Sequence, residues 1–169
     1  MNGLLPARNA VATVFAINGF IFASLFSRIP DIRAGLELSN SGLGLLLLAG
    51  ASGSMVALPT AGYLIRRTSA AAVVRAGGMA TALAVPVAAV GAQVTGSVPL
   101  TGIGLVGYGA GMGIWDVAMN VEGATVERGL GRSLMPRFHA AFSLGSVLGA
   151  IASSRSPSGD SHWTIVWSG

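Results

Sequence analysis

The sequence has no cysteine and no lysine, and only 9% of its 169 residues carry a charged side chain. The absence of cysteine excludes disulfide bonds, thiol catalysis and thiolate metal sites. The two histidines, His139 and His162, show no metal-ligand spacing, so we expect neither a metal nor another cofactor. Because an ordinary soluble domain carries roughly a quarter charged residues, this scarcity of charge also argues against a soluble enzyme.

Apolar residues take the place of the missing charges. Hydrophobic residues make up 52% of the chain, and the mean hydropathy is +0.70. A chain embedded in lipid needs no charged coat, because its outer surface meets acyl chains and only its loops meet water. We therefore expect an all-α membrane protein with the lipid bilayer as partner. The sequence pI of about 11.1 would also suit nucleic acid, but the arginines lie scattered between apolar runs, which favours membrane topology and no nucleic acid.

Uncharged runs of sequence mark the expected membrane crossings, since about 20 apolar residues span a bilayer as a helix. They predict about five transmembrane helices, at about 9–27, 39–65, 73–92, 99–123 and 138–152. We expect Ser39 to cap the second helix and Pro99 to lie in the first turn of the fourth. The first run has 19 residues, which is longer than a signal-peptide core, so we expect it to be retained.

The last segment, 153–169, is rich in serine and breaks the composition where the fifth helix is still short. From 138 to 152 that helix would be about 22 Å long, against a hydrocarbon core of about 30 Å. A truncated gene or a shifted reading frame explains this change, and so does an outer loop followed by a sixth helix near 162–167. We therefore expect an atypical polar tail over 153–169.

Arginines orient the predicted helices, because basic residues in short loops are retained on the cytoplasmic side. With the N-terminus inside, the outer segments hold Arg28, Arg33 and Arg155. The inner segments then hold seven arginines: Arg8, Arg66, Arg67, Arg75, Arg128, Arg132 and Arg137. This distribution predicts a cytoplasmic N-terminus, with the connecting segments 66–72 and 124–136 on the same side.

Small residues recur along the predicted helices at spacings that let helix backbones approach closely in lipid. They are Gly50, Gly53, Ser54, Gly107, Gly109, Gly111, Gly113, Gly145 and Gly149. The spacing predicts tight packing between helices. The alternative is that a chain this rich in alanine and glycine matches the pattern by chance at any single pair.

Asp116 follows forty uncharged residues, 76–115. Steps of three or four residues place Gly109, Gly113, Asp116, Asn120, Gly123 and Glu127 on one helix face. An ionisable group inside a span costs at least ~2.5 kcal/mol, so it usually faces a bundle interior or an aqueous path. Asp116 and Asn120 are therefore candidates for a substrate and proton pathway. The alternative is that Asp116 marks the cytoplasmic end of a short fourth helix.

Four further residues have two possible roles each, and a fifth, Glu122, has one. Asn18 in the first helix could line the same pathway or make an interhelical hydrogen bond. His139 could relay protons or lie hydrogen-bonded at the interface. Trp115 and Tyr108 could stack on a sugar ring, although aromatic residues near membrane interfaces are ordinary. Glu122 lies off the small-residue face and is expected at the interface.

Four stretches of the sequence together resemble the major facilitator superfamily (MFS), in particular its fucose-permease-like branch. They are "NGFIFASLFSRIPDIR" (18–33), "LELSNSGLGLLLLAGASGS" (36–54), "GIWDVAMNVEGATVER" (113–128) and "FHAAFSLGSVLGA" (138–150). Their order is similar to helices one, two, four and five of that family, which implies part of the amino-terminal helical bundle. The sequence Asp116-Val-Ala-Met-Asn120 is similar to a branch motif whose acid serves proton coupling, and this role carries over to Asp116 only.

Three positions depart from the family's pattern, and one of them is Ser69, which stands where the loop motif has its second glycine. The motif expected in the cytoplasmic loop between helices two and three keeps Gly62, Leu64 and Arg67, but Arg66 stands at its acidic position. Asn18 stands where the fucose-permease type has an acid, so the proton site would be single rather than paired.

The resemblance implies transport of a small, sugar-like polar solute together with protons across a bacterial inner membrane. The family's transporters consist of two six-helix halves, so the implied partner is a missing carboxy-terminal half or another membrane chain. Three alternatives remain open. They are a non-transporting small membrane subunit, a half-size transporter that dimerises, and an MFS member that exports drugs or metabolites.

Overall fold

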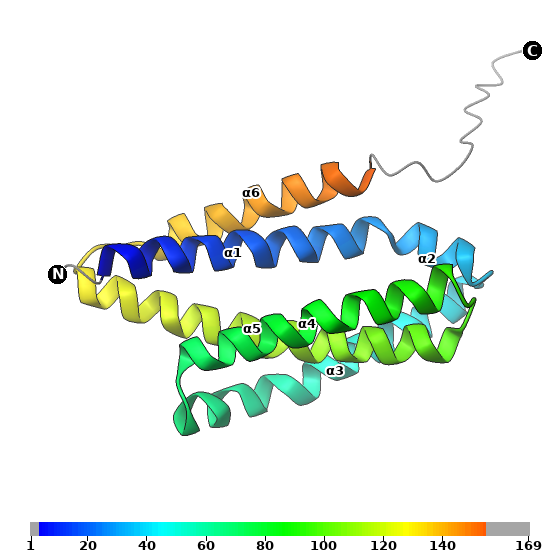
Figure 1. Cartoon of the computed structure of the whole chain (residues 1–169), viewed down its shortest axis with the longest axis horizontal. Coiled ribbons are helices and arrows are strands. Elements are labelled where there is room, and N and C mark those ends of the chain that lie inside the picture. Colours follow the sequence, from blue (N-terminus) through cyan, green and yellow to red (C-terminus); the bar gives the residue numbers. More distant parts are fainter. Residues whose placement is uncertain (1–3, 155–169) are drawn as a thin grey trace, which may run out of the picture.

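The computed structural model describes residues 4–154, and within this range the chain is entirely helical (Figure 1). The helices are α1 (Leu4–Ser27), α2 (Ile29–Gly35), α3 (Asn40–Arg67), α4 (Ala70–Gln93), α5 (Val98–Leu130) and α6 (Met135–Ser154). Four of the described helices, α1, α3, α4 and α5, are long and apolar enough to cross a membrane. The predicted all-α membrane fold is confirmed.

Serine side chains begin three of the long helices. Ser39, Ser69 and Ser97 accept hydrogen bonds from backbone N–H groups in the first turns of α3, α4 and α5. These N–H groups have no partner within the helix, so a serine oxygen at this position stabilises the helix start. Pro99 lies in the first turn of α5, where its missing N–H costs nothing. The predicted roles of Ser39 and Pro99 are confirmed.

Several boundaries differ from those expected. α5 continues to Leu130 rather than ending near 123, and it stops at Gly131, whose left-handed φ of 61° suits glycine. The connection expected at 66–72 consists of Thr68 and Ser69 alone, because α3 and α4 continue on both sides. The short helix α2 was not expected. The polar tail and the possible sixth helix fall, apart from 153 and 154, outside the described residues.

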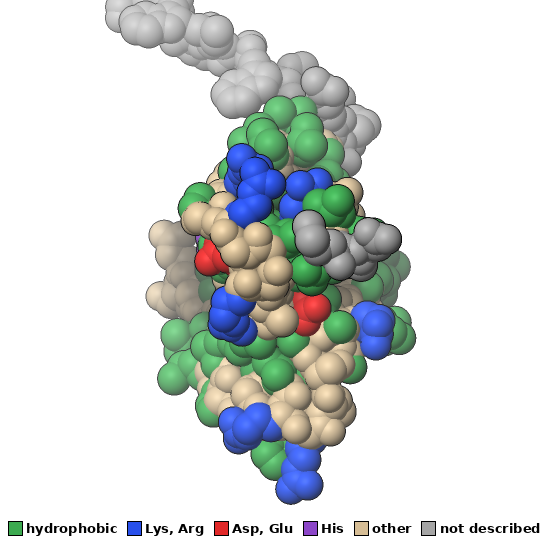
Figure 2. Space-filling model, turned by 90° about the vertical axis from the view of Figure 1, so that its left-hand side faces the viewer, with side chains coloured by type: hydrophobic (Ala, Val, Ile, Leu, Met, Phe, Trp, Pro, Cys, Tyr) green, Lys and Arg blue, Asp and Glu red, His purple; other side chains and the backbone are tan. Residues whose placement is uncertain are grey.

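The helices run alternately in opposite directions and form two groups. α1 packs on α6, and α5 packs between α3 and α4 while also contacting α1. Figure 1 shows the N-terminus, the α3–α4 turn and the α5–α6 turn at one end of the bundle, with α2 and the α4–α5 turn at the other. Arginines gather at the first of these ends (Figure 2). Assignment of that end to the cytoplasm stays a prediction.

Glycines lie where helix backbones meet. A Cβ atom at Gly109 would overlap the Gly50 carbonyl of α3, and one at Gly145 would overlap the Ala16 carbonyl of α1. Gly53 lies as close to α5, and Gly149 lies as close to α1. These contacts confirm that small residues pack the α3–α5 and α1–α6 pairs, since any larger side chain would push the helices apart.

A cluster of buried side chains joins the two helix groups where α1, α5 and α6 meet. Phe15 and Phe138 are stacked with ring centroids 5.6 Å apart, and Trp115 and Met119 of α5 complete the cluster. This cluster fixes α6 relative to α5, although the backbones of these two helices make few direct contacts.

Candidate functional site

Asp116 lies near the middle of α5, and the helix continues for 14 residues beyond it, from 116 to 130. The helix therefore does not end near Asp116, and the position of Asp116 relative to the membrane interface stays a prediction. The side chain is exposed on the surface of the described bundle, whereas Trp115 and Ala118 beside it are buried. Asn120 donates to the Asp116 carbonyl oxygen at 2.8 Å and more weakly to its Oδ1 at 3.4 Å.

His139 of α6 lies close enough to Asp116 for the two side chains to interact electrostatically. Its ring packs edge-on against Phe15, with centroids 5.4 Å apart and an interplanar angle of 85°. Ser143, one turn along, donates to the His139 carbonyl, so its hydroxyl is already used within α6. The fold thus brings Asp116, Asn120 and His139 to one surface across two helices. The arrangement joins a carboxylate, a carboxamide and an imidazole.

The face that includes Asp116 is narrower than the sequence suggested. Gly109 and Gly113 lie against α3, because their lack of side chains is what lets α3 approach. Gly123 faces Phe138 of α6. Glu127 accepts hydrogen bonds from the backbone N–H groups at the start of α6. The uncovered polar part of this face therefore consists of Asp116 and Asn120.

Asn18 is fully buried between α1 and α5. Its Nδ2 donates to the sulfur of Met112 at 3.7 Å. Sulfur is a weak acceptor, so this contact holds the carboxamide in place without strongly satisfying it. Of the two roles open for Asn18, the structure shows the interhelical contact.

The two aromatic candidates lie away from Asp116. Trp115 is buried against Gly77 and Gly78 of α4, and its indole N–H has no partner among the described residues. Tyr108 is also buried, and it lines an apolar cavity next to α1 and α3. Neither ring is presented on the surface that holds Asp116. Glu122, expected at the interface, is half-buried beside a groove that also includes Arg75.

The motif expected in the cytoplasmic loop is helical. Gly62, Leu64 and Arg67 occupy the last turns of α3, because the helix continues to Arg67 before the two-residue turn. The Arg67 guanidinium lies 5.2 Å from the centroid of the Tyr63 ring, a cation–π contact. Among residues 4–154, no ion pair involves Arg67.

Residues 4–154 hold no group of three or more acidic or histidine side chains that could bind a metal ion. The fold is that of a multi-pass membrane protein: long apolar helices, packed through glycines, with an isolated carboxylate midway along one of them. These features define the class of the protein, a multi-pass membrane protein, and similar sequences indicate its kind more closely.

The chain is similar to bacterial MFS-type transporters over most of its length. It is 38% identical over 137 residues to an uncharacterized MFS-type transporter of Yersinia pestis. The aligned residues make up 80% of this chain and 34% of the relative. It is 35% identical over 150 residues to the uncharacterized transporter y4wD of Sinorhizobium fredii (strain NBRC 101917 / NGR234), covering 89% and 39% of the two chains. Identity to the membrane protein MosC of Rhizobium meliloti is 29% over 140 residues, covering 83% and 33%.

The chain therefore spans between a third and two fifths of the length of these curated relatives. Their names describe transporters or a membrane protein, and none is that of an enzyme. No protein-family model matches the chain. No solved structure matches it either.

The sequence indicated Asp116 and Asn120 as candidates, and their role stays a prediction. It gave no indication of the apolar cavity beside Tyr108. The cavity is lined by Phe22 and Phe26 of α1, which are one helical turn apart, and by residues of three other helices. The spacing of the two phenylalanines was the only available signal. It does not separate a cavity wall from an ordinary lipid-facing stripe.

Proposed function

We propose that this chain is part of an MFS-type transporter that moves a small solute across a bacterial inner membrane, coupled to protons. The observation that carries the proposal is an exposed carboxylate at the middle of a helix that is otherwise fit to cross a membrane. A charged group facing hydrocarbon costs at least ~2.5 kcal/mol, so this surface requires water or a polar partner. A water-filled cavity between this bundle and the rest of a longer transporter would supply both.

Within that cavity Asp116 is the group that takes up and releases the proton. The Asn120 carboxamide, one turn away, donates to the carboxylate without adding charge. His139, on the opposite helix, is a second titratable group within electrostatic reach. Asn18 stands where the resembling branch has an acid, so the proton site on this bundle is a single carboxylate.

The solute is a small polar molecule such as a sugar, and it binds between this bundle and the remainder of the transporter. This assignment rests on the resemblance of Asp116-Val-Ala-Met-Asn120 to the fucose-permease-like branch. The similarity to MFS-type transporters supports the coarser statement, which is transport across a membrane. The partner is a carboxy-terminal half or another membrane chain that covers the surface of Asp116.

The test is Asp116→Asn in a full-length transporter that carries this segment. We expect loss of accumulation driven by a proton gradient, whereas exchange of solute across the membrane without a gradient continues. The amide keeps the shape and hydrogen bonding of the carboxylate and removes only the titratable proton. Glu122→Gln is the matched control on the same helix and should leave both activities unchanged. Intact gradient-driven uptake in Asp116→Asn, or failure of that variant to insert, would refute the coupling role.

A further inference from the structure

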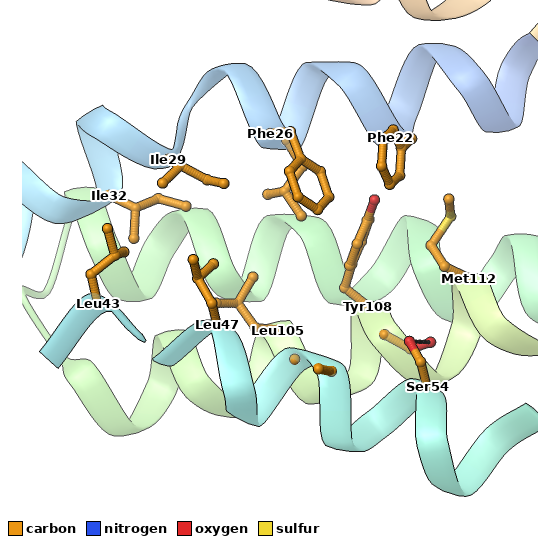
Figure 3. Close-up of a pocket in the computed structure, with 14 residues that line it drawn as sticks. Phe22, Phe26, Ile29, Ile32, Leu43, Leu47, Ser54, Leu105, Tyr108 and Met112 are labelled. Carbon is orange, nitrogen blue, oxygen red and sulfur yellow. Dashed lines mark hydrogen bonds between the residues drawn. The ribbon is translucent and has the colours of Figure 1, made fainter. Parts of the chain in front are cut away.

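An apolar cavity of about 330 Å³ opens between α1, α2, α3 and α5 (Figure 3). Its walls include Phe22 and Phe26 of α1, Leu47 of α3, and Leu105, Tyr108 and Met112 of α5. No charged side chain lines it. This size falls at the small end of the range for ligand-binding pockets, which is roughly 300–1,000 Å³.

The Tyr108 hydroxyl is the unusual feature of this cavity. Tyr108 is 7% exposed, and its hydroxyl has no hydrogen-bond partner among the described residues. Figure 3 shows the ring rising from α5 toward α1, with the hydroxyl ending beneath the rings of Phe22 and Phe26. Buried hydroxyls in native proteins are nearly always hydrogen-bonded, so a missing partner calls for a physical explanation.

The only other hydroxyl on the cavity wall, that of Ser54, already has a partner. It donates to the Gly109 carbonyl oxygen at 2.9 Å and thereby joins α3 to α5. The cavity therefore offers apolar walls and a single free hydroxyl, whose proton can be donated. The two phenylalanine rings above that hydroxyl are stacked with centroids 4.4 Å apart. Phe22 is 39% exposed and Phe26 is 47% exposed. Few side chains of the described bundle therefore restrict the rotation of these rings on its outer surface.

We propose that this cavity binds an uncharged, mainly hydrocarbon molecule with one hydrogen-bond acceptor, which receives the proton of the Tyr108 hydroxyl. A sugar or an ion would lose many hydrogen bonds to water here and regain one, which disfavours both. An acyl chain of a lipid would fill the cavity but would leave the hydroxyl without a partner. A ligand with one or two rings and a carbonyl or ether oxygen satisfies the walls and the hydroxyl together.

This site is separate from the proposed proton site. Asp116, Asn120 and His139 do not line the cavity. The inference therefore does not rest on proton coupling or on transport. Binding to the isolated chain can be measured even if the proposed function fails.

Benzophenone is a suitable probe, because it has two aromatic rings and one carbonyl acceptor. On irradiation its carbonyl oxygen takes a hydrogen atom from a nearby C–H group, and the two carbon radicals combine into a C–C bond. The 169-residue chain in phosphatidylcholine nanodiscs would be irradiated with increasing benzophenone, and the labelled peptides mapped by mass spectrometry. We expect saturable labelling on Met112, Leu105 and their neighbours in the cavity. Labelling that does not saturate, or that spreads over the lipid-facing helix surfaces, would overturn the proposal.

Three variants distinguish the contribution of the Tyr108 hydroxyl to binding from that of the apolar cavity walls. Tyr108→Phe removes one oxygen and should raise the half-saturating benzophenone concentration about fivefold, within the range of a net hydrogen bond. Tyr63→Phe, at the exposed tyrosine near the end of α3, is the matched control and should change nothing. Ala51→Phe adds a ring from an exposed position on the cavity wall and should abolish saturable labelling.

Thermal unfolding of each variant checks that the fold is kept. Equal half-saturation in Tyr108→Phe and the parent chain would show an apolar groove in which the hydroxyl plays no part. That result would overturn the proposal in favour of a lipid-filled groove.

Discussion

At the scale of single residues, most hydroxyl groups in the helices are already satisfied by their own backbone. Thr81, Thr101 and Ser146, for example, each donate to the carbonyl four residues earlier. Such hydrogen bonds use the hydroxyl within its own helix and add little to the stability of contacts between helices. The side chains that stand out are Asp116 and Tyr108. One is a carboxylate on an uncovered surface, and the other is a hydroxyl without a partner among the described residues.

Glycine contacts at this scale give a direct test of packing. Gly145→Ala puts a methyl group into the Ala16 carbonyl, so α1 and α6 must separate. Overpacking of this kind costs about 1–3 kcal/mol. Gly44→Ala in α3 is the matched control: nothing lies within 4 Å of the added Cβ, and alanine is the better helix former by about 1 kcal/mol. Reversible unfolding in detergent should therefore show opposite shifts for the two variants. Equal shifts would contradict the packing described for α1 and α6.

How much could be predicted from the sequence differs between residues. The position of Asp116 within a helix and its hydrogen bond with Asn120 follow from local spacing, so both could be foreseen. The approach of His139 depends on how α6 crosses α5, which no local pattern encodes. Trp115, next to Asp116 in the sequence, was a candidate for stacking on a sugar ring. Neighbouring residues in a helix point about 100° apart, and the indole is buried against α4 instead.

At the scale of helices, the start of α6 is fixed by a residue of the preceding helix. The Glu127 carboxylate accepts from the backbone N–H groups of Leu134 and Met135, the latter at 2.7 Å. A carboxylate at a helix N-terminus also interacts favourably with the helix dipole. This contact ties the last turn of α5 to the first turn of α6 and fixes the short connection between them.

Glu127→Gln should loosen that connection. The amide oxygen can still accept both hydrogen bonds, because both N–H groups donate to a single oxygen of Glu127. It loses the negative charge that strengthens them, so hydrogen exchange at Leu134 and Met135 should become several-fold faster. The rest of α6 should exchange as before. Glu122→Gln, one and a half turns earlier on α5, serves as the control and should leave exchange at these two amides unchanged. Unaltered exchange in Glu127→Gln would show that the cap does not hold the turn.

Helix existence was predictable here, whereas helix ends were predictable only where a local signal marks them. Ser39 and Pro99 are such signals, and both act as expected. The extension of α5 to Leu130 was missed because charged residues near its end were taken to mark a loop. Charge ends a membrane crossing but does not end a helix. The short helix α2 was missed because it lies within a segment taken as a loop on the same ground.

At the scale of the whole molecule, the ends of the bundle differ in charge. Arginines gather at the end formed by the N-terminus, the α3–α4 turn and the α5–α6 turn. At the other end Arg28 lies 4.0 Å from Asp31, which offsets its charge. The asymmetry supports a cytoplasmic location for the arginine-rich end, because basic residues in short loops stay on that side.

Because the chain lacks cysteine, this orientation can be tested with single introduced thiols. Ser69→Cys lies in the α3–α4 turn and Ser97→Cys in the α4–α5 turn, at opposite ends of α4. In intact cells a membrane-impermeant maleimide should label Ser97→Cys, and it should label Ser69→Cys only after the cells are opened. The opposite pattern would invert the topology.

The uncovered carboxylate also predicts how the chain behaves without a covering partner. In a longer transporter, Asp116 would face water or protein, and its charge would cost little. In the isolated chain within nanodiscs the same side chain meets lipid, where a charged group costs about 2.5–3.5 kcal/mol on insertion scales. Asp116→Asn should therefore raise the stability of the isolated chain toward unfolding by up to about this amount.

Asp31→Asn, at a half-buried position of the short helix α2, is the control for a general effect of removing negative charge and should leave stability nearly unchanged. A loss of stability in Asp116→Asn would mean that the interactions of the carboxylate within this bundle outweigh its cost in lipid. These interactions include the electrostatic one with His139. The interactions of Asp116 would then be complete within this chain. The surface of Asp116 would not need the second half that the proposed transporter requires.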